Sequence, residues 1–186
     1  MVTTHTNSAW AIRARAHMYV GPLGLHTPNQ IVLDLIEALV STFPKGDKEE
    51  GKPLFGTPMG LQLVTHTHPK GLVELTMDLL DPVDISDLDR HMTTLVAGGG
   101  HNGLVVANAL SSTASCLAVG GTLATYVYKC GELLHSSGQG EARILRFQFQ
   151  LDRDVLPFVE ISLTEECIRE HVDKVYQYLP ITFSMV

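Results

Sequence analysis

The chain has 186 residues, of which 45% are hydrophobic and 18% are charged. This balance is typical of a globular protein and excludes a disordered chain, and we expect a single domain over residues 1–186. With 13 basic against 20 acidic residues, the net charge of −7 argues against free-standing nucleic-acid binding, because phosphate backbones are themselves anionic.

The first half of the chain alternates between helical and strand-like patterns. Apolar residues at helical spacing predict a helix over 28–42, and three prolines with four glycines predict a flexible loop over 44–60. The segments 61–67 and 72–77 alternate between apolar and polar residues on either side of a "HPKG" turn, which predicts a β-hairpin. A further helix is expected over 86–97.

The second half begins with a glycine-rich stretch that leads into a predicted helix over 103–111. Two alternating segments, 112–119 and 122–129, are joined by two glycines, which predicts a second hairpin. The alternation in "ARILRFQFQL" predicts a strand over 142–151.

The chain closes with a predicted helix over 162–179 and a strand over 181–186. We expect Ser162 and Glu165 to form a capping box at the start of that helix. The order of elements predicts an α+β fold: a two-layer sandwich with one mostly antiparallel mixed sheet and helices on one face.

Three short stretches carry recognisable motifs: "IRARAHMYVGPLGLH" at 12–26, "MTTLVAGG" at 92–99 and "GHNGLVVANALS" at 100–111. In this order they resemble the ATPase domain of the DNA gyrase B subunit and its topoisomerase IV relative. The third resembles that family's phosphate loop and following helix. The resemblance implies the GHKL, or Bergerat, ATP-binding fold. The matching residues of the first stretch are Arg13, Arg15, Met18, Tyr19, Gly21, Leu25 and His26.

The same alignment shows what the chain lacks for ATP hydrolysis. The family's general base and magnesium ligand fall at Ile31 and Leu35, whose alkyl side chains can neither take a proton nor ligate a cation. The adenine-binding turn reads "DLLDP" at 78–82 and has lost its glycines, and the long lid before the phosphate loop is absent. The family's strand threonine falls at Arg143. We therefore expect no ATPase activity and interpret the glycine loop as inherited scaffold. The alternative is that the helix start near Gly103 binds an anion.

The resemblance also indicates where a reused pocket would lie. Asp34, Asp78 and His101 are the candidates for acid–base catalysis, because carboxylates and imidazoles can take up and release protons. A structural role is an equal alternative for Asp34 and His101. The ligand pocket is expected to be lined by residues of the same motifs: Ile31, Leu35, Ala38, Asp81, Arg143, Gly99, Gly100 and Gly103.

A more specific expectation concerns Arg143. It stands where the family has the threonine that binds adenine together with the retained aspartate, Asp78. Because a partly buried arginine needs a partner, we expect a salt bridge between the two that blocks the adenine site. The alternative is that Arg143 points to the other face of the sheet, since strand residues alternate.

Three function hypotheses follow. In the first, the former nucleotide pocket binds a small, largely apolar molecule, as a cofactor-independent acid–base enzyme such as an isomerase, lyase or cyclase. In the second, the chain is a regulatory or self-resistance mimic of the gyrase ATPase domain that binds topoisomerase subunits or inhibitors. In the third, it binds ATP weakly without turnover. We expect a small-molecule ligand, no cofactor, no nucleic acid and no membrane partner, and a homodimer is left open.

Two further expectations concern metals and location. His66 and His68 are too few for a metal site, so we expect none. The chain starts without an apolar secretory segment, no apolar run reaches membrane-spanning length, and three cysteines leave an odd thiol in any disulfide scheme. These features favour a cytoplasmic protein.

Overall fold

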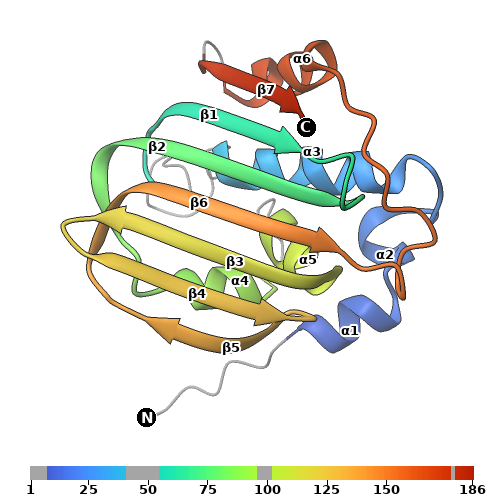
Figure 1. Ribbon diagram of the computed structural model, residues 1–186, viewed down its shortest axis with the longest axis horizontal. Helices are drawn as coiled ribbons and strands as arrows, with labels where there is room; N and C mark the ends of the chain where they lie inside the picture. Colours follow the sequence, from blue (N-terminus) through green and yellow to red (C-terminus); the bar gives the residue numbers. More distant parts are fainter. Residues whose placement is uncertain (1–7, 41–54, 96–101, 177–178) are drawn as a thin grey trace, which may run out of the picture.

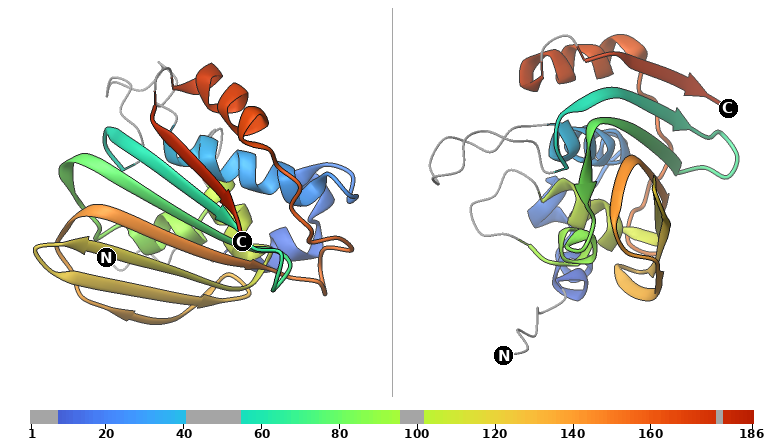
Figure 2. Two further views of the ribbon diagram at one scale, coloured as in Figure 1. Left: turned by 45° about the horizontal axis from the view of Figure 1, so that its top comes forward. Right: turned by 90° about the vertical axis from the view of Figure 1, so that its left-hand side faces the viewer.

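The computed structural model describes residues 8–40, 55–95, 102–176 and 179–186. It is a two-layer α+β sandwich in which helices cover one side of a seven-stranded sheet (Figure 1, Figure 2), which confirms the expected fold class. The strands are β1 Pro58–Thr65, β2 Leu72–Asp84, β3 Ser111–Gly120, β4 Leu123–Lys129, β5 Glu132–Ser137, β6 Glu141–Leu151 and β7 Ile181–Met185. The helices are α1 Ala9–Ala14, α2 His17–Val20, α3 Thr27–Val40, α4 Leu88–Thr93, α5 Gly103–Ala109 and α6 Glu165–Val175.

The sheet has the strand order β5-β4-β3-β6-β2-β1-β7. Both expected hairpins are present, as the antiparallel pairs β1–β2 and β3–β4. Strand β6 lies between them and pairs antiparallel with β2 and β3, so it joins the two hairpins into one sheet. Strand β7 adds to the edge of β1 as the parallel neighbour.

Apolar and polar side chains alternate along the strands, and the helices cover the apolar side of the sheet. In β6, Leu145, Phe147 and Phe149 are buried, whereas the intervening Arg146 and Gln148 are exposed. The buried face packs against the helices, because burying this apolar surface is the main favourable term in folding. The opposite face has no helix over it in the described part of the chain (Figure 2).

Several elements differ from the sequence-based expectations. Strand β1 begins at Pro58, inside the loop expected over 44–60, and residues 44–54 of that loop lie outside the described residues. The short helices α1 and α2 and the strand β5 were not predicted. All six residues of β5 are exposed, so this strand carries no burial alternation that a sequence pattern could show.

The capping box expected at Ser162 and Glu165 is wrong. Helix α6 is capped by Thr164, whose hydroxyl oxygen accepts a hydrogen bond from the Cys167 amide at 3.3 Å. Ser162 is held elsewhere, since it exchanges two hydrogen bonds of 3.0 and 2.9 Å with the Asn29 side chain at the start of α3. This pairing keeps Ser162 outside the helix and moves the cap by two residues.

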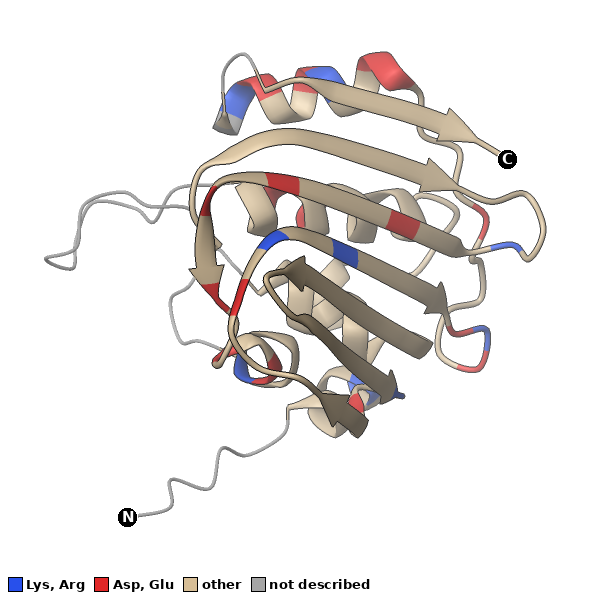
Figure 3. Cartoon of the chain, turned by 60° about the vertical axis from the view of Figure 1, so that its left-hand side comes forward, with Lys and Arg blue, Asp and Glu red and all other residues tan. Residues whose placement is uncertain are grey.

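No helix among the described residues is both long and apolar enough to cross a bilayer. Figure 3 shows Lys and Arg intermixed with Asp and Glu on the strands and on α6.

Candidate functional site

A pocket lies where α2, α3 and α5 meet. Its volume is about 300 Å³. It brings together Asp34 of α3, Gly103 at the start of α5, and Met18 and Tyr19 of α2, which belong to three separate stretches of the chain. The full lining is Met18, Tyr19, Asp34, Glu37, Asn102, Gly103 and Val106. Of the residues expected to form the site, Asp34 and Gly103 therefore share one pocket.

Gly103 allows the two helices to approach closely. A Cβ atom at this position would lie 2.1 Å from the Asp34 carbonyl oxygen and 3.0 Å from the Leu35 amide nitrogen. Both contacts are with backbone, which cannot swing aside as a flexible side chain would. The glycine is thus required for packing of α5 on α3, whatever ligand the pocket holds.

In this pocket, the pKa of Asp34 departs from its ordinary value. Burial raises its pKa, and the neighbouring Glu37 raises it further. A hydrogen bond of 2.6 Å from the Gln30 side chain and the charge of His171 act in the opposite direction without cancelling the rise. His171 of α6 lies 3.3 Å from a Glu37 carboxylate oxygen. The pocket therefore has an acidic wall whose carboxyl group can exchange a proton closer to neutral pH than a free aspartate.

The aliphatic face of α3 does not line the pocket. Ile31, Leu35 and Ala38 are buried in the hydrophobic core, and the expectation that they form an open apolar cavity is wrong. The helical repeat explains the error: these three residues share the side of α3 that packs inward, whereas Asp34 and Glu37 share the adjoining side.

The expected salt bridge between Asp78 and Arg143 is also wrong, because no ion pair within 4.0 Å joins these two described residues. Asp78 is exposed between the buried Met77 and Leu79, so it lies on the helix-free face of the sheet. It pairs in register with Ile144, and Arg143 is the next residue along β6, where the register shifts. Asp78 therefore lies outside the α2–α3–α5 pocket.

The remaining expected site residues are Asp81, Gly99, Gly100 and His101. Asp81 is exposed within the irregular part of β2 and lines none of the pockets described here. Gly99, Gly100 and His101 lie outside the described residues. Within the described ranges, no three His, Cys, Asp or Glu side chains are grouped so as to hold a metal ion.

Arg13 has a role that sequence reasoning missed. It links α1 to the last residue of α5 and to the residue that follows β6. Its guanidinium donates to the Ala109 carbonyl oxygen at 2.9 Å and pairs with the Asp152 carboxylate at 2.6 Å. Burial favours the neutral form of Asp152, but hydrogen bonds from Arg13 and the Asp154 amide outweigh burial and lower the pKa of Asp152.

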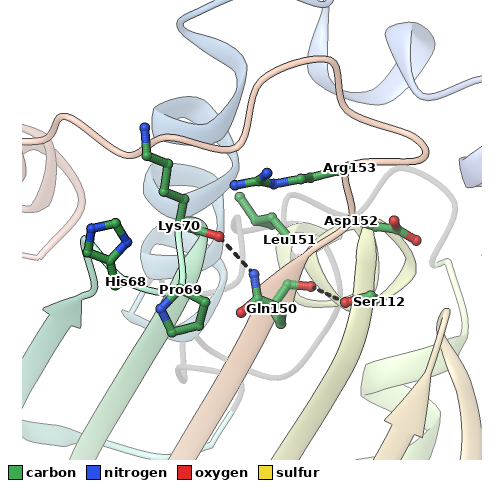
Figure 4. A pocket seen from close by; sticks show the side chains of 8 residues that line it. All are labelled: His68, Pro69, Lys70, Ser112, Gln150, Leu151, Asp152 and Arg153. Carbon is green, nitrogen blue, oxygen red and sulfur yellow. Dashed lines mark hydrogen bonds between the residues drawn. The ribbon is translucent and has the colours of Figure 1, made fainter.

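A second pocket, of about 450 Å³, lies at the end of the sheet beside Asp152 (Figure 4). It is formed by the turn between β1 and β2, the end of β6 and the start of β3. Its lining residues are His68, Pro69, Lys70, Ser112, Gln150, Leu151, Asp152 and Arg153. None of the sequence motifs pointed to it, because its residues come from a turn and from strand ends without a shared pattern.

The chain was compared with known proteins. No protein-family model matches it, and no curated protein matches its sequence.

Proposed function

We propose that this chain is a relative of the gyrase-B type of ATPase domain that no longer hydrolyses ATP and binds a small molecule in the α2–α3–α5 pocket. One observation carries the proposal. Met18 and Tyr19 belong to the first motif of the resemblance and Gly103 to the third, and both motifs border one pocket with Asp34. This meeting of two motifs at one pocket, next to Asp34, supports the proposal.

The proposal excludes ATP turnover because two positions needed for catalysis carry unsuitable side chains. Ile31 and Leu35 occupy the positions of the base and the magnesium ligand, and both are buried in the core. A hydrocarbon side chain supplies neither a proton acceptor nor an oxygen ligand. We therefore expect no magnesium-dependent hydrolysis of ATP. Measured turnover that is abolished by a pocket substitution would overturn this part of the proposal.

The pocket lining indicates the character of the ligand. Met18, Tyr19 and Val106 supply apolar surface, while Asp34, Glu37 and Asn102 supply polar groups on the same pocket. Such a site suits a small molecule with an apolar body and one hydrogen-bond donor or basic group directed at the carboxylates. Asp34, with its raised pKa, is the group we propose for proton transfer to or from that ligand.

A ligand screen tests the proposal. We expect small apolar amines and alcohols to raise the melting temperature of the wild-type chain, because a ligand that binds only the folded state stabilises it. Met18→Gln should remove these shifts. The matched control is Met59→Gln, since Met59 is similarly exposed on β1 and lines none of the pockets described here. Equal shifts in both variants would contradict the assignment of the pocket.

A second candidate function is the protein-binding mimic of the gyrase ATPase domain. It is favoured by exposed apolar side chains near the start of the described chain: Trp10 is 80% exposed, Leu25 67% and Met18 64%. All three residues come from one short stretch of the chain, and exposed apolar patches often mark protein-binding surfaces. Under this candidate, purified gyrase or topoisomerase IV subunits should bind the wild-type chain but not Trp10→Ser, whereas Asp34→Asn should bind normally.

The proposal also includes a cytoplasmic location. Cys116, Cys130 and Cys167 are all free thiols in the structure, as is usual for proteins kept in a reducing compartment.

A further inference from the structure

The pocket at the end of the sheet carries basic side chains in a chain of net charge −7. Lys70 enters it from the turn between β1 and β2, and Arg153 from the segment after β6. Figure 4 shows the guanidinium of Arg153 extended over Leu151 toward Lys70, while the Asp152 carboxylate points away from both. Residues distant in sequence thus bring two positive groups to one opening.

The two basic groups are available to a ligand. Arg153 is exposed and makes no hydrogen bond or ion pair with any described residue. Lys70 pairs with Glu160 at 3.0 Å, but both side chains of this pair are substantially exposed. Exposed ion pairs contribute little to stability, so the Lys70 ammonium can exchange Glu160 for a ligand anion at small cost.

The backbone that carries these groups is held firmly. The Lys70 carbonyl oxygen accepts a hydrogen bond of 2.9 Å from the Gln150 side chain, and the Leu151 amide donates to the Gly71 carbonyl at 2.9 Å. Arg153 lies between Asp152, which is fixed by Arg13, and Asp154, whose amide donates to the Asp152 carboxylate. A rigid backbone under two exposed cationic side chains reduces the ordering cost of binding.

The nearby Asp152 does not repel an anion strongly. Its carboxylate accepts hydrogen bonds from the Arg13 guanidinium at 2.6 Å and from the Asp154 amide at 2.9 Å. Its charge is therefore compensated on the side away from the opening. Gln150 and Ser112 add polar lining next to Leu151, which offers apolar surface for the rest of a ligand.

We infer that this pocket binds the phosphate group of a small phosphorylated molecule. Arginine presents paired donors that match phosphate oxygens, and lysine adds a mobile positive charge. A volume of about 450 Å³ exceeds the needs of a bare phosphate ion and suits a phosphate ester with a modest organic group. This site is separate from the α2–α3–α5 pocket, so the inference does not depend on the proposed function.

Isothermal titration calorimetry with phenyl phosphate at constant ionic strength tests the inference. We expect saturable binding to the wild-type chain, weakened about tenfold or more by Arg153→Gln and to a smaller extent by Lys70→Gln. The matched control is Arg146→Gln, because Arg146 is also exposed and lies on β6 away from the pocket. Circular dichroism of each variant verifies that the fold is retained, as expected for substitutions of exposed residues.

One control variant and one control ligand complete the experiment. Asp34→Asn should leave phenyl phosphate binding unchanged, so failure of the proposed function and failure of this inference remain distinguishable. Benzoate should bind far more weakly than phenyl phosphate. The inference is overturned if Arg153→Gln and Arg146→Gln behave alike, if benzoate binds equally well, or if the wild-type chain shows no saturable binding.

Discussion

The two pockets of this protein shift the pKa of a lining aspartate in opposite directions. In the α2–α3–α5 pocket, burial and a neighbouring carboxylate raise the pKa of Asp34. In the pocket at the end of the sheet, Arg13 and a backbone amide outweigh burial and lower the pKa of Asp152. Asp34 is therefore suited to exchange a proton, whereas Asp152 is suited to remain charged and hold structure together.

The difference follows from how each pocket is built. The first is formed by helices that approach so closely that Gly103 is required, and its two carboxylates contact the Gln30 amide and the His171 imidazole but no guanidinium among the described residues. The second is formed by strand ends and a turn whose backbone is anchored by Arg13, Gln150 and Gly71. Substitutions at Gly103, Asp152 and Asp34 test this difference between the two pockets.

Gly103→Ala should have the largest effect. The added Cβ would lie 2.1 Å from the Asp34 carbonyl oxygen, so α5 must move away from α3. We expect the free energy of unfolding to fall by about 3 kcal/mol, the upper end of the usual cost of overpacking. Urea denaturation measures this change.

The control for this substitution is Gly121→Ala. A Cβ atom at Gly121 meets no atom within 4 Å, so this variant should be close to wild type in stability. If both variants lose the same stability, the close helix contact does not constrain the first pocket as we describe.

Asp152→Asn should have an intermediate effect. The substitution removes the charged partner of Arg13 and should lower the free energy of unfolding by about 2 kcal/mol at pH 7. Since the pKa of Asp152 is lowered by folding, its stabilising contribution is present above the ordinary carboxyl pKa. It is lost as the pH falls through the lowered value.

Urea denaturation of the wild type and of Asp152→Asn from pH 7 to pH 3 measures this dependence. The difference between the two chains should shrink toward the acid end of the series. A difference that stays constant over the series would show that Asp152 acts through packing and not through charge.

The sequence predicted the sheet far better than it predicted the site. Both hairpins and β6 alternate between buried and more exposed residues over most of their lengths, and α3 has a clear apolar face. The apolar face of α3 also caused the error in the site prediction. Apolar residues at helical spacing look the same in a sequence whether they line a cavity or fill the core, and Ile31 and Leu35 fill the core. Of the residues to which the resemblance pointed, Asp34 and Gly103 line one pocket, whereas Asp78 lies on the helix-free face.

The second pocket could not have been predicted from the sequence. Lys70 and Arg153 lie in a turn and in a segment after a strand, where no periodic pattern fixes the direction of a side chain. Their proximity depends on the pairing of β2 with β6 across the middle of the sheet. Such long-range pairing is set by tertiary packing and leaves no local signal.

Asp34→Asn should have the smallest effect on stability, and its sign should be opposite to that of Asp152→Asn. Folding raises the pKa of Asp34, so the wild-type chain loses stability as the pH rises through that raised value. Asparagine keeps the shape and the hydrogen bond from Gln30 but cannot ionise. The variant should therefore equal the wild type at acid pH and exceed it at pH 7 by less than about 1 kcal/mol. Asp81→Asn, at an exposed residue of β2, is the matched control for the loss of one negative charge. A loss of stability at pH 7 in Asp34→Asn would mean that the Asp34 charge is compensated like that of Asp152, and the contrast between the two pockets would not hold.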